Sequence, residues 1–409
     1  MKVGFCDVIS DLDREMEKRG IQSLFVFGDQ TLGNPDLAYV VGAPLPRGGI
    51  WLKRHGNSPT LVVSNIDIGS AKAGRVKNIK TYSDFDQEKI YSKYPRDEAR
   101  AKLYMKMVKE EGLGGPTVIG GKNDSSSTLQ LVDSLRKGGL KVVGEKSPTI
   151  IESARETKDR FEIERLRRVG KRTCQVVKET TRFLRKANIR GSKVYYKSKP
   201  LKVGDVRHVI GSLLNENNLV AMEDTIFAPG RRSADPHYRG ENEDSIKAGE
   251  PIVFDIFPSE PEGYWHDTTR TYVLGSPQRN VKEMYNAVYE AQMNAVDMVK
   301  EKASCRELMF STCKLFESHG YPTVRQLIKG NKEARVRGFI HGLGHGVGLT
   351  IGERPYLSLY GDERLRKGAV VTIEPGLYDP KYGGVRIEDI MVVGSPSENL
   401  TSLDKDMEL

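Results

Sequence analysis

Short apolar runs alternate with amphipathic segments through the first third of the chain. Five of these runs are typical of β-strands and lie at residues 23–27, 49–52, 60–64, 117–120 and 141–144. Residues 7–20 and 96–112 instead have the mixed apolar and charged pattern of helices. Because strands that alternate with helices are typical of α/β proteins, the pattern predicts an α/β domain in this part of the chain.

The pattern changes near residues 148–160, where a long amphipathic helix is predicted to begin. Its apolar or small side chains recur at steps of three and four residues, at Ile163, Leu166, Gly170, Cys174 and Val177. This spacing places them on one face of a helix. We therefore predict a domain boundary here, with a first domain at residues 1–152 and a second at 153–409.

The order of elements in the second domain is predicted to repeat. The long helix is followed by a shorter one (206–218) and then by strands, the last of which lie in residues 251–275. A second long helix (280–302) is followed by a shorter one (305–320) and by strands that end within 370–393. The halves share almost no residue identity, so only the order repeats. The pattern predicts an α+β domain with an internal pseudo-repeat.

Each half of the second domain ends in a predicted β-hairpin that carries two carboxylates. Asp255 and Asp267 lie twelve residues apart across one turn, and Glu374 and Glu388 lie fourteen apart across the other. In a regular hairpin, such even separations would let each pair face each other on one side of the sheet. Facing like charges destabilise a sheet, and buried carboxylates are costly without compensation. The pairs predict a compensating cation; the alternative is that all four acids point to solvent.

The segment HGLGHGVGL (341–349) places His341 and His345 among glycines, between the two hairpins in the sequence. Three interpretations compete: a metal site, a phosphate-binding loop and a flexible surface loop. The segment has no GK[ST] and misses the GxGxxG spacing, which disfavours a phosphate-binding loop. A neutral imidazole binds Zn, Mn, Co or Fe well beside carboxylates, and glycines let the backbone approach a crowded centre. The carboxylate hairpins therefore favour the metal site.

Composition changes this interpretation little. Hydrophobic residues make up 38% of the chain and charged residues 29%, which is typical of a soluble protein with a sizeable core. No apolar run approaches the ~20 residues of a membrane helix, and the first residues lack a signal-peptide core, so we expect a cytoplasmic protein. The four cysteines form no CxxC pair, which argues against a zinc ribbon.

The formal net charge of +9 raises the question of a nucleic-acid partner. Basic and acidic residues are interspersed along much of the chain. We therefore interpret the charge as a solvated basic surface and do not expect nucleic acid as a partner.

Five motifs together resemble one family, the pita-bread metallopeptidases, which includes prolidase (Xaa-Pro dipeptidase), aminopeptidase P and methionine aminopeptidase. The motifs are SADPHY (233–238), DTTRT (267–271), HGLGHGVGL, IEPGLY and GGVRIED. The resemblance covers residues 155–395. The N-terminal domain resembles the creatinase/prolidase N-terminal domain, which methionine aminopeptidases generally lack. The resemblance therefore favours the prolidase and aminopeptidase P branch.

The resemblance implies two divalent metal ions, of Mn, Co, Zn or Fe, with five ligands: Asp255, Asp267, His345, Glu374 and Glu388. Asp267 and Glu388 would bridge the two ions. Asp255 would chelate one ion, and His345 and Glu374 would bind the other. Such a centre can produce hydroxide at neutral pH and polarise a scissile carbonyl.

The resemblance also implies catalytic roles. Glu374 would move a proton between the nucleophilic water and the leaving nitrogen. His237 and His341 would contact the substrate, and Arg386 would orient the bridging acids. The implied activity is hydrolysis of Xaa-Pro bonds in dipeptides or short proline-containing peptides by a homodimer.

The chain departs from the family pattern in two places. The separation of Asp255 and Asp267 is one residue longer than the usual eleven, which an insertion at a hairpin tip would explain. Family members usually have a second catalytic histidine seven residues after the metal-binding one, and this chain has Gly352 there. Loss of such a donor costs about 10²–10³ in rate. Arg354, two residues on, is a candidate substitute.

Two other functions are compatible with the motifs. One is a creatinase-like hydrolase, which has the same fold and uses no metal. The other is a catalytically impaired pita-bread module that binds nucleic acid or proteins, which the net charge and Gly352 favour. Retention of all five ligands argues against both, because a metal-free enzyme or a pure binder has no use for two facing carboxylate pairs.

Overall fold

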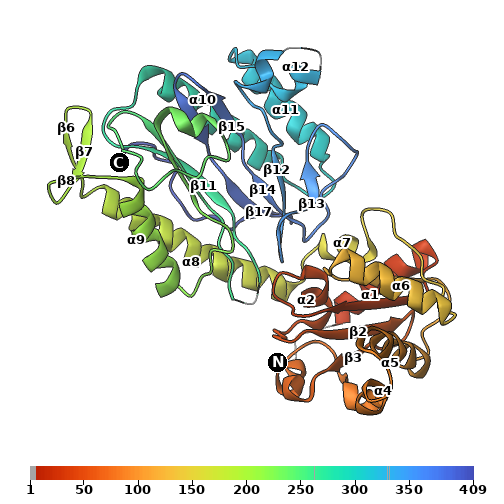
Figure 1. Ribbon diagram of the computed structural model, residues 1–409. Helices are drawn as coiled ribbons and strands as arrows, with labels where there is room; N and C mark the ends of the chain where they lie inside the picture. The colour runs from red at the N-terminus through yellow and green to blue at the C-terminus, as the bar shows by residue number, and fades with distance from the viewer. Residues whose placement is uncertain (1–5, 262, 329, 331) are drawn as a thin grey trace. The chain divides into compact units, whose positions relative to one another are not determined.

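The computed structural model describes residues 6–261, 263–328, 330 and 332–409 (Figure 1). Contacts between residues divide the chain into two compact units, Met1–Arg155 (unit 1) and Glu156–Leu409 (unit 2). This division lies three residues beyond the boundary that the sequence predicts. Within the described ranges, none of the helices combines the length and the apolar character that crossing a membrane requires.

Unit 1 is built on a mixed five-stranded sheet of order β4-β3-β2-β1-β5. Its strands are β1 (Ser23–Gly28), β2 (Gly49–Arg54), β3 (Thr60–Val63), β4 (Asn78–Thr81) and β5 (Thr117–Gly120). Its helices are α1 (Cys6–Arg19), α2 (Pro35–Val41), α3 (Ile68–Lys72), α4 (Gln87–Tyr91), α5 (Arg96–Glu110), α6 (Ser125–Lys137) and α7 (Ile150–Arg155). Apolar side chains of α5 and α6 pack with those of β1, β2 and β3 in one core. The predicted α/β domain is therefore confirmed.

Four of the five predicted strands in this unit are present, and the fifth prediction is wrong. Of residues 141–144, only Val142 makes a single bridge, to Thr117. Strand β4 was not predicted because its sequence, NIKT, lies at the edge of the sheet and has no apolar run. An edge strand is paired on one side only and is identified poorly by hydrophobicity.

Unit 2 contains the predicted repeat of element order. The first half has α8 (Arg160–Leu184), α9 (Val203–Glu216), β9 (Ile226–Pro229), β10 (Pro251–Ile256) and β11 (Thr268–Val273). The second half has α10 (Arg279–Met298), α11 (Cys305–Ser318), α12 (Val324–Ile328), β12 (Gly344–Val347), β13 (Ile351–Leu357), β14 (Val370–Ile373) and β17 (Asp389–Val392). Three small strands lie within the first half: β6 (Asn188–Arg190), β7 (Lys193–Tyr196) and β8 (Lys199–Pro200). Three more lie within or after the second hairpin: β15 (Gly376–Asp379), β16 (Gly383–Arg386) and β18 (Glu398–Asn399).

The long helix predicted from residues 148–160 is in fact two helices, α7 and α8. Helix α8 begins at a capping box, in which the Asp159 side chain accepts from the Glu162 N–H and the Glu162 carboxylate accepts from the Asp159 N–H. The capping box therefore starts a new helix after α7. The apolar face of α8, including Leu166 and Val177, is buried in a core that also contains residues of β10 and β17.

Strand register brings the carboxylates together in two different ways. In the first hairpin Asp255 pairs with Thr269, so Asp267 lies diagonal to Asp255 on the same face rather than directly opposite. In the second hairpin, Ile373 pairs with Asp389 and Gly376 pairs with Arg386. Glu374 and Glu388 therefore occupy opposite positions in a gap of the ladder. Within that gap, the Glu388 N–H donates to the Thr269 carbonyl of β11 at 3.0 Å, which links the two hairpins.

Candidate metal centre

One cavity of unit 2, about 850 Å³ in volume, collects the five proposed metal ligands and the other three implied catalytic residues. Its lining includes His237, Asp255, Asp267, His341, His345, Glu374, Arg386 and Glu388. Most of them lie within strands or one residue from a strand end, so the sheets determine their positions. Asp255, Asp267, Arg386 and Glu388 are buried, whereas His237 is exposed at the cavity wall.

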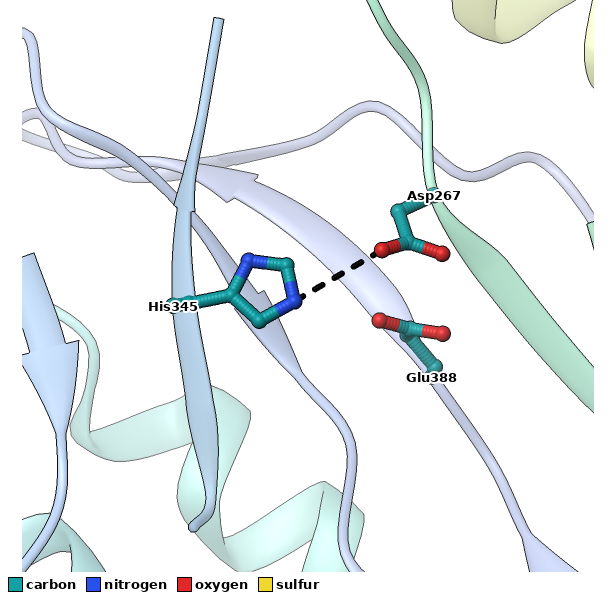
Figure 2. Close-up of side chains that lie close together, drawn as sticks. All are labelled: Asp267, His345 and Glu388. Carbon is teal, nitrogen blue, oxygen red and sulfur yellow. Dashed lines mark ion pairs between the residues drawn. The ribbon is translucent and has the colours of Figure 1, made fainter. Parts of the chain in front are cut away.

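Asp267, His345 and Glu388 form the centre of this cavity. Each offers one ligand atom, and these three atoms lie within 4.8 Å of one another. Figure 2 shows the three side chains pointing into a common space from three different strand regions. His345 Nε2 lies 3.6 Å from Asp267 Oδ2 and also 3.6 Å from Glu374 Oε1. The arrangement suits divalent metal binding between an imidazole and several carboxylates.

The ring of His345 is oriented for metal binding by its other nitrogen. Its Nδ1 lies 3.1 Å from the Gly346 carbonyl. The Gly352 N–H also donates to this Nδ1 at 3.1 Å, so Nδ1 is held between a carbonyl and a backbone N–H. These contacts orient the ring with Nε2 toward the carboxylates, as neighbouring polar groups do for metal-binding histidines.

A buried hydrogen-bond chain supports the cluster from one side. Arg386 Nη2 donates to Asp255 Oδ2 at 2.6 Å, and Arg386 Nη1 donates to the Tyr378 hydroxyl at 2.7 Å. The Tyr378 hydroxyl lies 3.0 Å from His341 Nε2, and His341 Nδ1 lies 2.7 Å from the Gly342 carbonyl. Both nitrogens of His341 thus have partners, while burial lowers the pKa of His341 and keeps the ring neutral.

Threonines complete the support on the other side of the cluster. Thr269 Oγ1 accepts from Arg386 Nε at 3.1 Å and donates to Glu388 Oε2 at 2.8 Å. Sequence reasoning missed Thr269 and Tyr378, although both lie inside the quoted motifs DTTRT and IEPGLY. The motif positions were the available signal, and only the tertiary structure shows that Thr269 contacts Glu388 and Arg386 whereas Tyr378 contacts Arg386 and His341.

The electrostatics of the cluster call for positive charge. Burial, reinforced by the neighbouring carboxylates, raises the pKa values of Asp267 and Glu388 well above their usual range. Burial also raises the pKa of Asp255, although Arg386 opposes this shift. Asp255 Oδ1 is buried and has no hydrogen-bond partner among the described residues. A buried carboxylate oxygen without a hydrogen-bond donor is costly. The carboxylates of this cluster therefore fit a bound cation better than they fit burial without any partner.

Gly352, which stands where the resemblance predicts a histidine, lies in a bulge. The pairing of β12 with β13 shifts between Gly346–Glu353 and Val347–Ile351, which leaves Gly352 as the extra residue. Its φ of +72° is unfavourable for any residue with a Cβ, and a Cβ there would meet nothing within 4 Å. This position therefore departs from the family pattern in two ways. The imidazole is missing, and the backbone has the conformation of a bulge in place of an ordinary strand.

The proposed substitution of Arg354 for that imidazole is wrong. The guanidinium of Arg354 pairs with Glu363, and Arg354 is not part of the cavity lining. The bulge at Gly352 breaks the strand alternation on which the prediction relied. Tyr356 lines the cavity instead, and its hydroxyl donates to the Gly352 carbonyl at 2.8 Å.

Comparisons with known proteins agree with this geometry. The chain matches metallopeptidase family M24 over residues 164–395. It is 28% identical to the Xaa-Pro dipeptidase of Pyrococcus furiosus, over 98% of this chain and 99% of that one. It is 29% identical to the Xaa-Pro dipeptidase of Pyrococcus horikoshii, over 96% of each. The crystal structure of a prolidase from P. horikoshii OT3 superposes with a TM-score of 0.74 at 27% identity, over 98% of this chain and 99% of that one.

Proposed function

The chain belongs to metallopeptidase family M24, and from this premise we propose that it is an exopeptidase that hydrolyses Xaa-Pro bonds of dipeptides or short peptides with two divalent metal ions. One observation carries the proposal: four carboxylates and His345 converge on a cavity in which three of the carboxyls have raised pKa values. The names of the two Pyrococcus relatives support the Xaa-Pro specificity.

Five residues would hold the ions in this proposal: Asp255, Asp267, His345, Glu374 and Glu388. Asp267 and Glu388 are the candidates for bridging, because each offers a ligand atom within 4.8 Å of the other's and of His345. Divalent ions of Mn, Co, Zn or Fe, when bound, supply Lewis acidity toward a carbonyl and lower the pKa of water.

The remaining steps belong to the side chains of the chain itself. Glu374 is partly exposed to the cavity, with a side-chain exposure of 19%, so it can accept a proton and deliver it to the leaving nitrogen. Arg386 opposes the rise in the pKa of Asp255 and orients this carboxylate through its hydrogen bond. His237 offers its ring to the substrate from the cavity wall, whereas His341 would contact the substrate through its ring edge, because both of its nitrogens have partners.

The direct test combines metal analysis with two substrates. The purified protein is assayed for bound metal, then for cleavage of an Xaa-Pro dipeptide and an Xaa-Pro-Yaa tripeptide, with and without chelator. We expect bound divalent metal and chelator-sensitive cleavage. Absence of both metal and cleavage would overturn the proposal in favour of a binding module, and cleavage that survives complete metal removal would favour a creatinase-like hydrolase.

We also propose that the protein is a cytoplasmic homodimer. Light scattering of the purified protein measures its mass in solution and so tests the dimer.

Metal removal should make stability strongly pH-dependent. A carboxyl whose pKa is raised in the folded state favours the protonated form there. Its stabilising contribution is complete at low pH and is lost as pH rises through the raised pKa. Since Asp267 and Glu388 are such groups, we expect the melting temperature of chelator-treated protein to fall between about pH 5 and about pH 8. Calorimetry should find that added Mn²⁺ raises it more at the higher pH; equal shifts at both would contradict this.

Arg239 is proposed to select substrates with a free carboxylate. It lines the cavity two residues after His237, and among the described residues no acidic group pairs with it. Arg239→Ala should lower kcat/KM for an Xaa-Pro dipeptide by roughly 10–100-fold, the loss expected for a charged hydrogen bond. The matching dipeptide amide should be cleaved equally by both proteins. Arg231→Ala, an exposed change outside the cavity, is the control; equal losses on the dipeptide and the amide would contradict the assignment.

A further inference from the structure

The positive charge of the chain is concentrated in one segment of unit 2. Residues 180–204 contain eight Lys or Arg residues and no Asp or Glu, whereas the rest of the chain is nearly balanced. The net charge of +9 is therefore almost entirely a property of this segment. The segment departs from the interspersed pattern of the chain as a whole.

The middle of the segment, residues 188–200, folds into the small antiparallel sheet β6-β7-β8, which Figure 1 draws at the edge of unit 2 beside α8 and α9. Val194 of β7 and Leu201, just after β8, are buried in the core of the unit and anchor the sheet. The Ala248 N–H donates to the Ser192 carbonyl at 3.0 Å, which ties the β6–β7 turn to a neighbouring segment. The sheet is therefore a fixed part of the fold.

The register of this sheet places like charges beside one another. Arg190 of β6 pairs directly with Lys193 of β7, and Lys193 also bridges to Lys247 on its other side. All three residues are exposed. Directly opposed like charges destabilise a sheet, so this row of Arg190, Lys193 and Lys247, which we call the cationic row, costs stability unless an anion occupies it.

The protein itself neutralises the row poorly. Within the described ranges, Arg190 and Lys193 have no ion pair with an acid, and Lys247 has only Glu250 at 3.9 Å. The guanidinium of Arg190 instead lies 5.3 Å from the ring centre of Tyr195, which is partly exposed. The row therefore combines uncompensated cations with an aromatic ring at its end.

We propose that the cationic row and Tyr195 bind single-stranded nucleic acid, with phosphates on the row and a base against the tyrosine. Such binding characteristically pairs a positive track with aromatic stacking. An anionic membrane is the weaker fit. A membrane-binding surface inserts large apolar side chains, and Ile189 is the only exposed one on the described residues of β6, β7 and β8. This proposal reverses the expectation from the sequence that nucleic acid is not a partner.

The site is separate from the peptidase cavity, because none of its residues lines that cavity. The test therefore uses the full metal-loaded protein and leaves catalysis as an internal check. The variant is Arg190→Thr, Lys193→Thr and Lys247→Thr together, because threonine suits a strand and removes the repulsion. The matched control removes three exposed charges from unit 1, by Lys93→Thr, Lys122→Thr and Lys137→Thr.

Affinity for a labelled 20-nucleotide oligothymidylate is measured by fluorescence anisotropy over a series of salt concentrations. We expect the triple variant to bind at least about tenfold more weakly than the unchanged protein, with the salt slope reduced by about 2, which corresponds to three lost phosphate contacts. The control should bind within about twofold of the unchanged protein, and Tyr195→Leu should lose about fivefold or more without a change of slope. Peptidase activity and melting temperature should not fall in any variant.

Three results would overturn the proposal. The unchanged protein does not bind the oligonucleotide, the control loses as much affinity as the triple variant, or anionic phosphatidylserine vesicles bind while the oligonucleotide does not.

Discussion

Glu374→Gln is expected to lower kcat for an Xaa-Pro dipeptide by roughly 10²–10⁴-fold, the usual contribution of a positioned general acid–base group. The amide keeps the size and one oxygen of the side chain but cannot accept the proton. Glu374 is the least buried of the four carboxylates, and its Oε1 lies 3.6 Å from His345 Nε2, so it is the acid best placed to exchange protons with a bound substrate. The measurement is kcat at saturating metal.

Metal content decides whether the loss is a catalytic one. Because Glu374 is also a proposed ligand, the bound metal of the variant is measured alongside its activity. Loss of activity with both ions retained assigns the effect to proton transfer, whereas loss of an ion assigns it to coordination. Glu223→Gln, a change of an exposed acid that lines the same cavity, is expected to keep kcat unchanged. Full activity of Glu374→Gln would remove Glu374 from the mechanism.

Arg270→Met is expected to lower the free energy of unfolding by about 3–5 kcal/mol, the cost of leaving a buried charge without its partner. Arg270 is 1% exposed and its Nη2 donates to Asp389 Oδ1 at 2.7 Å. Its Nη1 also donates to the carbonyl oxygens of Thr269 and Glu388, at 2.9 and 2.8 Å. Its removal takes one donor from each of these acceptors, although the Thr269 carbonyl keeps the Glu388 N–H and the Glu388 carbonyl keeps the Thr268 hydroxyl.

Denaturant unfolding in the presence of chelator measures this loss without a contribution from metal binding. The control is Arg167→Met, which breaks an exposed pair with Glu398 and should cost no more than about 1 kcal/mol. Asp389 also accepts from Lys405 Nζ at 2.7 Å, so Arg270→Met leaves it one cation. A loss below about 1 kcal/mol would mean that Lys405 and the surrounding donors satisfy Asp389 without Arg270.

Much of this protein was predictable because the signals are local. Helix faces and buried strands follow from the spacing of apolar residues, although the capping box that begins α8 was overlooked and one long helix was predicted in place of α7 and α8. The candidate ligands stand out because carboxylates are unusual in runs of β-branched residues. Each half of the repeat supplies one hairpin, and the hydrogen bond from the Glu388 N–H to the Thr269 carbonyl joins the two hairpins beside one cavity.

The sequence by itself determined the two-part α/β and α+β organisation, the repeat and the set of candidate ligands. Only the tertiary structure decided which residues face one another. Asp255 pairs with Thr269 rather than Asp267, Arg354 turns to Glu363 at a bulge, and Arg190 lies opposite Lys193. A shift of one residue in strand register, or one bulge, moves a side chain to another face at little change in local sequence preference. Register depends on contacts between segments far apart in the chain, which residue spacing does not encode.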